Sequence, residues 1–435
     1  MTFLLPGSPT HRGLDQILIF VRCTTFLMVA GVILPSWSKS SGAVEEWPQF
    51  RGIDGQGNTS ATGLPLTWSE EEHVVWKTAI AGRGWSSPVV SDNTIWLTTA
   101  LDDERSLRAV AVDLESGRVL RDIEVFRCDS FPPINGKNSY ASPTPVIESE
   151  RLYVHFGTLG TACLDTSTGE VLWTNRELTV DHKEGPGSSP VLFGDLLILN
   201  CDGIDVQYVV ALDKHSGKIA WRRDRPGPHN PVADFRKAYC TPLVIETDGH
   251  QELISPTANR VVAYDPLTGD ERWIVRYAGF SNVPRPIVAG GLVLVDTGYM
   301  KPQLWAIRPG GSGDVTDTHV VWRCARHAPA NPSPVAVGQE VFMVSDAGIA
   351  SCLDAATGKT LWQERLGGNF SASLLAGDGR VYFANEEGVV TVIEASRRFQ
   401  RLAENRLAGR IFASPAVVGK NLIWRTDGHL YRMAD

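Results

Sequence analysis

The stretch CLDTSTGEVLW, residues 163–173, decides the fold, because its pattern of aspartate, turn and tryptophan returns along the chain. Full copies of x-D-x-x-[ST]-G-x-x-x-W end at Trp173, Trp221, Trp273 and Trp362. The first three tryptophans are 48 (221 − 173) and 52 (273 − 221) residues apart. A weaker copy, VDLESGRVL, ends at Leu120, and a longer one, IRPGGSGDVTDTHVVW, ends at Trp322. The chain is therefore built from a repeated unit.

A second phrase, Ser-Pro or a variant of it, opens a β-rich run in each unit. Runs of this kind begin at Ser86, Ser142, Ser188, Cys240, Pro284, Pro332, Ser371 and Ala413. Within one unit, SPTPVIE, LYVHFG, TACLD and EVLWTN are four short apolar runs separated by turn residues. Four such runs predict an antiparallel four-stranded sheet. A period of this length is close to that of a propeller blade.

The recurring aspartate, glycine and tryptophan have a structural role in this scheme. The aspartate is expected to accept hydrogen bonds from backbone amides of the last hairpin, and the glycine supplies a positive φ. The tryptophan then packs against the neighbouring sheet. We assign this blade-docking role to Asp113, Gly117, Asp165, Gly169, Trp173, Asp213, Gly217, Trp221, Asp265, Gly269, Trp273, Trp322, Asp354, Gly358, Trp362 and Trp76.

The two ends of the repeat region complement each other. The last unit, residues 414–435, supplies only three strands, whereas HVVWKTAI, residues 73–80, is one strand with a tryptophan and no preceding partners. Closing the ring with this strand removes the unpaired ends. The sequence predicts an all-β, eight-bladed β-propeller of four-stranded antiparallel blades over residues 73–435, closed by an N-terminal strand. Residues 44–72 form an N-terminal segment before it.

Residues 1–43 have the composition of an export signal. The apolar run TTFLMVAGVIL, residues 24–34, follows basic side chains, and SSGA, ending at Ala43, offers small residues for cleavage. An uncleaved anchor that extends back to Ile17 is the alternative. We expect the protein to be exported to the periplasm or the cell exterior, with membrane contact only through this segment.

Charge and cysteine content exclude several classes of function. The net charge of −8 argues against nucleic-acid binding, because phosphate contacts require clustered Lys and Arg. The seven cysteines form no C-x-x-C or adjacent pair, so neither a zinc site nor a redox disulfide is predicted. Cys163 and Cys352 take the place of alanine in the repeat, which is typical of a small buried residue.

These repeats resemble the PQQ-like β-propeller family. The aspartate-to-tryptophan phrase is similar to the tryptophan-docking motif of quinoprotein alcohol dehydrogenases. The segments WPQFRG, residues 47–52, and GRGWSSPVV, residues 82–90, resemble an exported branch of the family. The chain is also similar to the BamB-type propellers of the outer-membrane assembly machine. It departs from them because Cys23 precedes the apolar run, so no lipid-attachment cysteine follows that run.

The resemblance implies two different functions. A quinoprotein dehydrogenase would carry PQQ with Ca²⁺ held by acidic and amide side chains, a catalytic aspartate and often an adjacent cysteine pair. This chain has no such pair, and its nearest acidic cluster, CDGID at residues 201–205, is better explained as an Asp-Gly turn. We expect no catalytic residue, no metal and no cofactor. A PQQ-dependent oxidoreductase and a propeller glycan hydrolase or lyase remain the alternatives.

Two long connections indicate where a partner would bind. Residues 126–140 and 222–239 each join a docking phrase to the next Ser-Pro run, so both are expected on one face of the ring. The candidate binding residues on that face and around the channel mouth are Arg83, Trp85, Asn138, Tyr140, Arg236, Lys237, Tyr239, Asn282, Arg285, Asn331 and Arg410. Their chemistry favours a protein or polysaccharide partner for a monomeric scaffold. The alternative is that they only solvate the rim.

Overall fold

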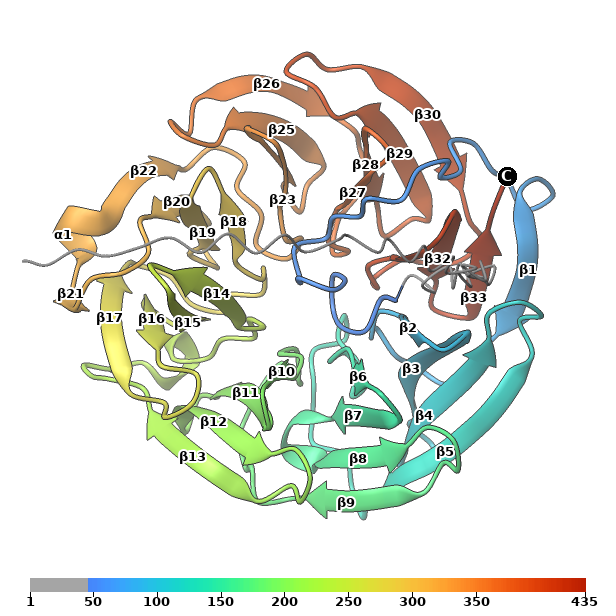
Figure 1. Ribbon diagram of the computed structural model, residues 1–435, viewed down its shortest axis with the longest axis horizontal. Helices are drawn as coiled ribbons and strands as arrows, with labels where there is room; N and C mark the ends of the chain where they lie inside the picture. Colours follow the sequence, from blue (N-terminus) through green and yellow to red (C-terminus); the bar gives the residue numbers. More distant parts are fainter. Residues whose placement is uncertain (1–45) are drawn as a thin grey trace, which may run out of the picture. The chain divides into compact units, whose positions relative to one another are not determined.

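Eight sheets, each containing four antiparallel strands, are arranged in a ring in the computed structural model, which describes residues 46–435 (Figure 1). The predicted eight-bladed β-propeller is therefore confirmed. Val44–Asp435 form one compact unit. The segment to which the export signal was assigned lies outside the described residues. Within the part of the chain that is described, none of the helices is long and apolar enough to cross a bilayer.

The first four blades follow one another along the chain, each counted from its inner to its outer strand. Blade 1 contains β2 (Val89–Ser91), β3 (Thr94–Leu101), β4 (Ser106–Asp113) and β5 (Val119–Arg127). Blade 2 contains β6 (Val146–Glu148), β7 (Arg151–His155), β8 (Thr161–Asp165) and β9 (Val171–Asn175), with the 3-10 turn η1 (Gly157–Leu159). Blade 3 contains β10 (Val191–Phe193), β11 (Leu196–Asp202), β12 (Gln207–Asp213) and β13 (Ile219–Asp224). Blade 4 contains β14 (Leu243–Thr247), β15 (His250–Thr257), β16 (Arg260–Tyr264) and β17 (Glu271–Arg276), and the 3-10 turn η2 (Ala233–Phe235) precedes it.

The remaining blades complete the circle. Blade 5 contains β18 (Ile287–Ala289), β19 (Leu292–Asp296), β20 (Leu304–Ile307) and β22 (Val320–Cys324). Blade 6 contains β23 (Val335–Val337), β24 (Glu340–Val344), β25 (Ile349–Asp354) and β26 (Thr360–Arg365). Blade 7 contains β27 (Leu375–Gly377), β28 (Arg380–Ala384), β29 (Val389–Glu394) and β30 (Arg401–Arg406). Blade 8 contains β31 (Ala416–Val418), β32 (Asn421–Arg425), β33 (His429–Met433) and the N-terminal strand β1 (Val74–Ala79).

The N-terminal strand closes the ring as the sequence predicts. Strand β1 pairs antiparallel with β33, and Trp76 lies opposite Arg432. The indole of Trp76 donates a hydrogen bond of 2.8 Å to the carbonyl of Leu114 in blade 1. The strand therefore completes blade 8 and also contacts the next blade.

Blade 4 differs from the others because the expanded fifth copy of the repeat reaches back to it. Strand β21 (Gly313–Asp314) pairs in parallel with β17 and makes a fifth strand, and the short helix α1 (Thr316–His319) follows it. The next copy has no docking glycine for Trp273, so this tryptophan makes a different contact. Its indole donates to the carboxylate of Glu252 at 3.1 Å, and its side chain is fully buried.

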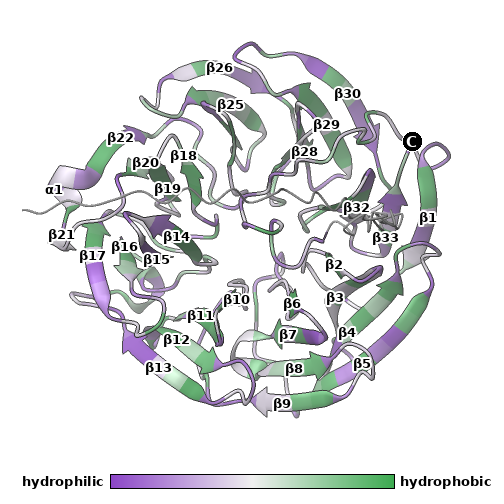
Figure 2. Cartoon of the chain, in the orientation of Figure 1, coloured by the Kyte–Doolittle hydropathy of each residue, from purple (hydrophilic) through white to green (hydrophobic). Residues whose placement is uncertain are grey.

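Most of the other docking tryptophans contact the following blade in one repeated geometry. The indole of Trp173 donates to the carbonyl of Lys214 at 3.0 Å, next to Asp213 of the following blade's phrase. A Cβ placed on Gly217 would lie 2.4 Å from the Trp173 ring, so only glycine leaves room for the indole. Figure 2 shows apolar colouring along middle strands such as β12 and mixed colouring on the outer strand β13.

The aspartate of each phrase holds the hairpin in which it lies. The Oδ1 atom of Asp165 accepts hydrogen bonds from the backbone amides of Ser167 and Thr168, at 2.9 and 2.8 Å. Their hydroxyl groups donate to the same atom. These bonds, led by that from the Ser167 hydroxyl, lower the pKa of Asp165 to about 2. The phrase thus folds its own turn through the aspartate and anchors the preceding blade through its glycine and backbone carbonyl.

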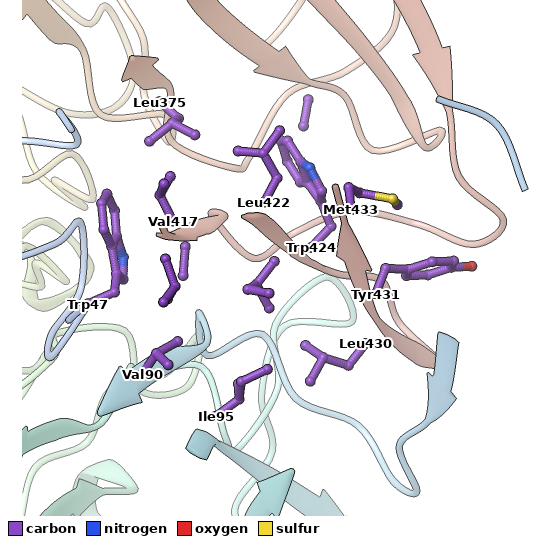
Figure 3. Close-up of a cluster of buried hydrophobic side chains, with 14 of the residues drawn as sticks. Trp47, Val90, Ile95, Leu375, Val417, Leu422, Trp424, Leu430, Tyr431 and Met433 are labelled. Carbon is purple, nitrogen blue, oxygen red and sulfur yellow. The ribbon is translucent and has the colours of Figure 1, made fainter. Parts of the chain in front are cut away.

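The N-terminal segment crosses the channel before it reaches β1 (Figure 1). Trp47 pairs antiparallel with Val90 of blade 1, and Asn58 pairs in parallel with Ala376 of blade 7. Trp47 belongs to the apolar cluster between these blades, where it lies beside Val90 and Val417 (Figure 3). The segment therefore contacts the inner strands of blades 1 and 7, which flank blade 8.

Candidate functional site

A ring of hydroxyl groups surrounds the channel and explains the recurring Ser-Pro phrase. In most blades the hydroxyl residue stands immediately before the proline, and its oxygen accepts a hydrogen bond from a backbone amide of the preceding blade. Seven junctions show this bond, at 2.9 to 3.1 Å: Ser87–Thr144, Thr144–Ser189, Ser189–Thr241, Arg285–Ser333, Ser333–Ser373, Ser373–Ser414 and Ser414–Ser87. The phrase is therefore a blade-to-blade connector on the inner side of the ring.

Arg285 replaces the hydroxyl residue in blade 5 and binds the N-terminal segment instead. Its Nη1 donates to the carbonyl of Phe50 at 2.6 Å, and its Nε donates to the carbonyl of Pro242 at 3.2 Å. The side chain is 2% exposed, and burial lowers its pKa to about 10. Arg51 lies nearby and donates to the backbone carbonyls of Ser333 and Pro334 in blade 6. Two buried arginines thus fasten the segment across the channel.

The channel opens on the face that carries the outer-to-inner connections, which we call the loop face. A cavity of about 670 Å³ lies there, which we call the funnel, and Phe50 is part of its lining. Both long connections predicted to share a face contribute to it, through Asn138 from one and Lys237 from the other. The funnel is also lined by Phe50 of the N-terminal segment and by hydroxyl residues of the ring such as Ser87 and Ser189.

Two aromatic groups stand on opposite sides of the funnel. Trp85 of blade 1 stacks on Phe412 of blade 8, with ring centroids 4.5 Å apart. Four blades away, Phe235 stacks on Phe280 at 4.4 Å, and Tyr299 meets Phe280 edge to face at 5.8 Å. Most of these rings come from connections between strands, which the stacked blades hold in place. The funnel therefore offers rigid aromatic surface on both walls.

The charged groups of the funnel are paired with each other. Lys237 lies 2.5 Å from Asp234 and 3.5 Å from Glu184, and its side chain is 4% exposed. Lys137, which also lines the funnel, lies 2.5 Å from Glu386, a buried residue outside the lining. These ion pairs leave the funnel without a strong charge of either sign.

The structure distributes the predicted binding residues over several places. Trp85, Asn138, Lys237, Tyr239 and Asn331 line the funnel. Tyr140 lines a second cavity of about 580 Å³ at blades 2 and 3, and Arg236 lines a small recess at blades 3 and 4. The guanidinium groups of Arg83 and Arg410 lie over the rings of Trp85 and Phe412.

Four of the predicted binding residues, Lys237, Tyr239, Asn282 and Arg285, are buried, and the last two do not line the funnel, which corrects the expectation that they surround an open mouth. Arg285 is the clamp on the N-terminal segment. Asn282 is fully buried, and its amide donates to the backbone carbonyl of Asp296 at 2.8 Å. Tyr239 lines the funnel but is 7% exposed, and its hydroxyl donates to the carbonyl of His182 at 2.8 Å.

Several residues that line the funnel could not be predicted from the sequence. Tyr299 and Met300 are 54% and 64% exposed and lie in the connection between β19 and β20, which carries no repeat motif. Phe235 and Phe280 lie in outer-to-inner connections. The only available signal was an aromatic residue and a methionine in the short turn DTGYMKP, residues 296–302. Phe50 lies within WPQFRG, whose path across the channel depends on contacts remote in sequence.

The funnel does not fit a calcium-bound quinone. Its carboxylates, Asp234 and Glu184, each lie within ion-pair distance of Lys237. Among residues 46–435, no three His, Cys, Asp or Glu side chains lie where they could hold a metal together. The six cysteines of the described chain are all free, and none adjoins another.

Comparison with known proteins places the chain in a family. Residues 134–300 and 312–433 match the family model described as outer membrane protein assembly factor BamB. The outer membrane protein assembly factor BamB of Burkholderia pseudomallei (strain K96243) is 22% identical over 364 residues, covering 78% of this chain and 84% of the relative.

Two solved structures share the fold at low sequence identity. BamB from Moraxella catarrhalis superposes with a TM-score of 0.58 at 14% identity, covering 83% of this chain and 99% of that one. The quinohemoprotein alcohol dehydrogenase of Comamonas testosteroni gives a TM-score of 0.62 at 12% identity, covering 89% and 80%. These two likenesses establish the propeller fold alone. Because the family model matches more than half of the sequence, the chain belongs to the BamB-type family of PQQ-like β-propellers.

Proposed function

We propose that the protein is an exported, non-catalytic scaffold of the cell envelope, which binds a protein partner on its loop face over the funnel. The observation that carries this proposal is the exposed pair Tyr299 and Met300 beside the stacked rings of the funnel. Tyr, Trp, Phe and Met are the residues enriched in the cores of protein interfaces. A few such anchors in a pocket supply most of the binding free energy of an interface.

The state of the polar groups supports a scaffold more than an enzyme. Catalytic groups need free hydrogen-bonding positions aimed at a reacting atom. In the funnel, the amide of Asn138 already donates to the carbonyls of Glu184 and Pro186, and Asn331 donates to Asp346. These contacts hold the loops in shape. A preformed surface of this kind loses little conformational entropy when a partner binds.

Family membership suggests which partner to expect. The family is described as outer membrane protein assembly factor BamB. We therefore propose that the partner is another protein of outer-membrane protein assembly and that the scaffold works as a monomer in the periplasm. A polysaccharide partner is the second outcome to test, because aromatic rings also stack on sugar rings.

The proposal is tested by capture of envelope proteins on the purified full chain. Replacement of both Tyr299 and Met300 by serine removes two exposed anchors, and we expect the affinity for the partner to fall at least tenfold. Ile53→Ser is the matched control, because Ile53 is 71% exposed but is not part of the funnel lining. Equal capture by the double variant and the control contradicts the loop-face assignment. Capture of glycan with no protein component contradicts the choice of partner.

The quinone-dependent oxidoreductase remains the alternative, since a quinohemoprotein dehydrogenase shares the fold. Titration of the protein with PQQ, with and without calcium, distinguishes the scaffold from the quinone-dependent oxidoreductase. We expect no saturable change in quinone absorbance at micromolar PQQ. Calcium-dependent saturation at one site per chain contradicts the scaffold proposal. A propeller hydrolase or lyase is tested in the same way by product release from envelope glycans.

A further inference from the structure

The long connection of residues 222–239 also covers a recess at blades 3 and 4. The recess is lined by Arg225, His229 and Arg236 from this connection, and by Gln207, Asn259 and Arg260 from the ends of strands beneath it. Its cavity is about 10 Å³, which is about the room that one water-sized occupant needs. None of the residues that line it is a carboxylate.

Arg260 differs from the other residues of this recess because its guanidinium is buried and only one of its three nitrogens has a hydrogen-bond acceptor. The residue is 2% exposed, and Nη2 donates to the carbonyl of Pro228. Nε and Nη1 are buried and have no hydrogen-bond acceptor among the described residues. A buried charged donor without an acceptor is costly, so native proteins place an acceptor or an ion beside it.

No carboxylate of the described chain forms an ion pair with Arg260, and Glu271 of β17 interacts with it only through longer-range electrostatics. Asp202 binds Arg225 through both oxygens, at 2.9 and 2.8 Å, in a pair that is almost fully buried. Asp314 lies 2.7 Å from Arg276 on the outer side of blade 4. The pKa of Arg260 lies below its ordinary value because of burial and then because of the positive charges of Arg276 and Arg225.

Arg236 adds a second positive charge that no carboxylate neutralises in the described chain. Its Nε donates to the carbonyl of Asn230 at 2.6 Å and its Nη2 to the carbonyl of Pro231 at 3.1 Å. Backbone carbonyls fix the position of the guanidinium but carry no full negative charge. His229 is an exposed residue of the same lining. The recess therefore combines a water-sized space, an unsatisfied buried donor and an excess of positive charge.

We propose that this recess is a binding site for a small anion, which takes either a chloride ion or one oxygen of a carboxylate group. Arg260 is the main donor through Nε and Nη1, and Arg236 contributes charge at the rim. A complete sulfate or phosphate is too large for the space. This site is separate from the funnel and does not depend on the proposed partner.

The test measures how anions stabilise the full chain against unfolding. Sodium chloride or sodium acetate replaces sodium methanesulfonate at constant ionic strength, so that only the anion changes. Binding to the folded state alone raises the unfolding midpoint as the anion concentration rises. We expect saturable stabilisation of the wild type and at least a tenfold loss of apparent anion affinity in Arg260→Gln. Arg223→Gln, an exposed arginine on β13, is the matched control and should respond like the wild type.

The outcomes distinguish the two sources of the anion. A stronger response to chloride identifies a halide site, and a stronger response to acetate identifies a site for an acidic side chain or chain terminus. Arg236→Gln is the second variant if Arg260→Gln fails to fold, and it should weaken binding several-fold. The proposal is overturned if the wild type shows no saturable response, or if the recess variants respond as Arg223→Gln does.

Discussion

Trp221 and Gly269 show at residue scale how one blade is fastened to the next. The Trp221 indole donates to the carbonyl of Pro266 at 3.2 Å, and the residue is 7% exposed. Gly269 has φ of +73°, and a Cβ added there would lie 2.6 Å from the Trp221 ring. The glycine is thus required twice, once for its backbone conformation and once for the space that the indole occupies.

A double-mutant cycle separates these two requirements. We expect Trp221→Ala to lower the free energy of unfolding by about 3–5 kcal/mol, the range for truncating a buried large aromatic residue. Gly269→Ala should cost about 1–3 kcal/mol more than Gly249→Ala, because overpacking adds to the cost of a positive φ. Gly249 is the matched control, with φ of +78° and nothing within 4 Å of an added Cβ.

The decisive quantity is the coupling between the two sites, measured by denaturant unfolding. In the Trp221→Ala background, Gly269→Ala should cost only as much as Gly249→Ala, since the clashing ring is gone. Strict additivity of the two substitutions would show that the ring and the glycine do not constrain each other. The same cycle can be repeated at Trp322 and Gly358, where the added Cβ would lie 2.5 Å from the ring.

At the scale of strands and connections, repetition decides what can be predicted from the sequence. Most blades repeat two local phrases, so the period, the docking residues and the single strand at residues 73–80 could be predicted from the sequence. The missing fourth strand of the last unit was enough to place β1 beside β33. The fifth strand β21 was not predicted, because a short parallel pairing in one expanded copy has no counterpart elsewhere in the repeat.

The N-terminal segment illustrates the other limit of prediction. Trp47, Arg51 and Asn58 show no apolar period, and their partners lie in blades 1, 6 and 7. In the sequence, Arg285 belongs to PRPIV, which looks like one more variant of the Ser-Pro phrase. Its hydrogen bond to the N-terminal segment is apparent only in the structure. The candidate site was therefore predicted in part. The strand order was enough to predict that both long connections lie on one face. It was not enough to predict which residues of that face are exposed and which are buried.

At the scale of the whole molecule, the ring and its N-terminal segment form one compact unit. The segment pairs with blades 1 and 7, contacts blades 5 and 6 through Arg285 and Arg51, and then supplies the outer strand of blade 8. Two buried arginines fasten it, and the hydroxyl ring joins the inner strands of the blades. A funnel of fixed shape requires all of these contacts, so the proposed function depends on closure of the ring.

The most direct test of this closure is an unfolding experiment on a chain that begins at Gly82 instead of Val44. We predict that the shorter chain loses the single cooperative transition and binds an apolar dye, because blade 8 then has an uncovered edge and the channel lacks Arg51 and Phe50. Adding residues 44–81 as a separate peptide should restore the transition. An unchanged midpoint for the shorter chain would show that the segment is not part of the ring.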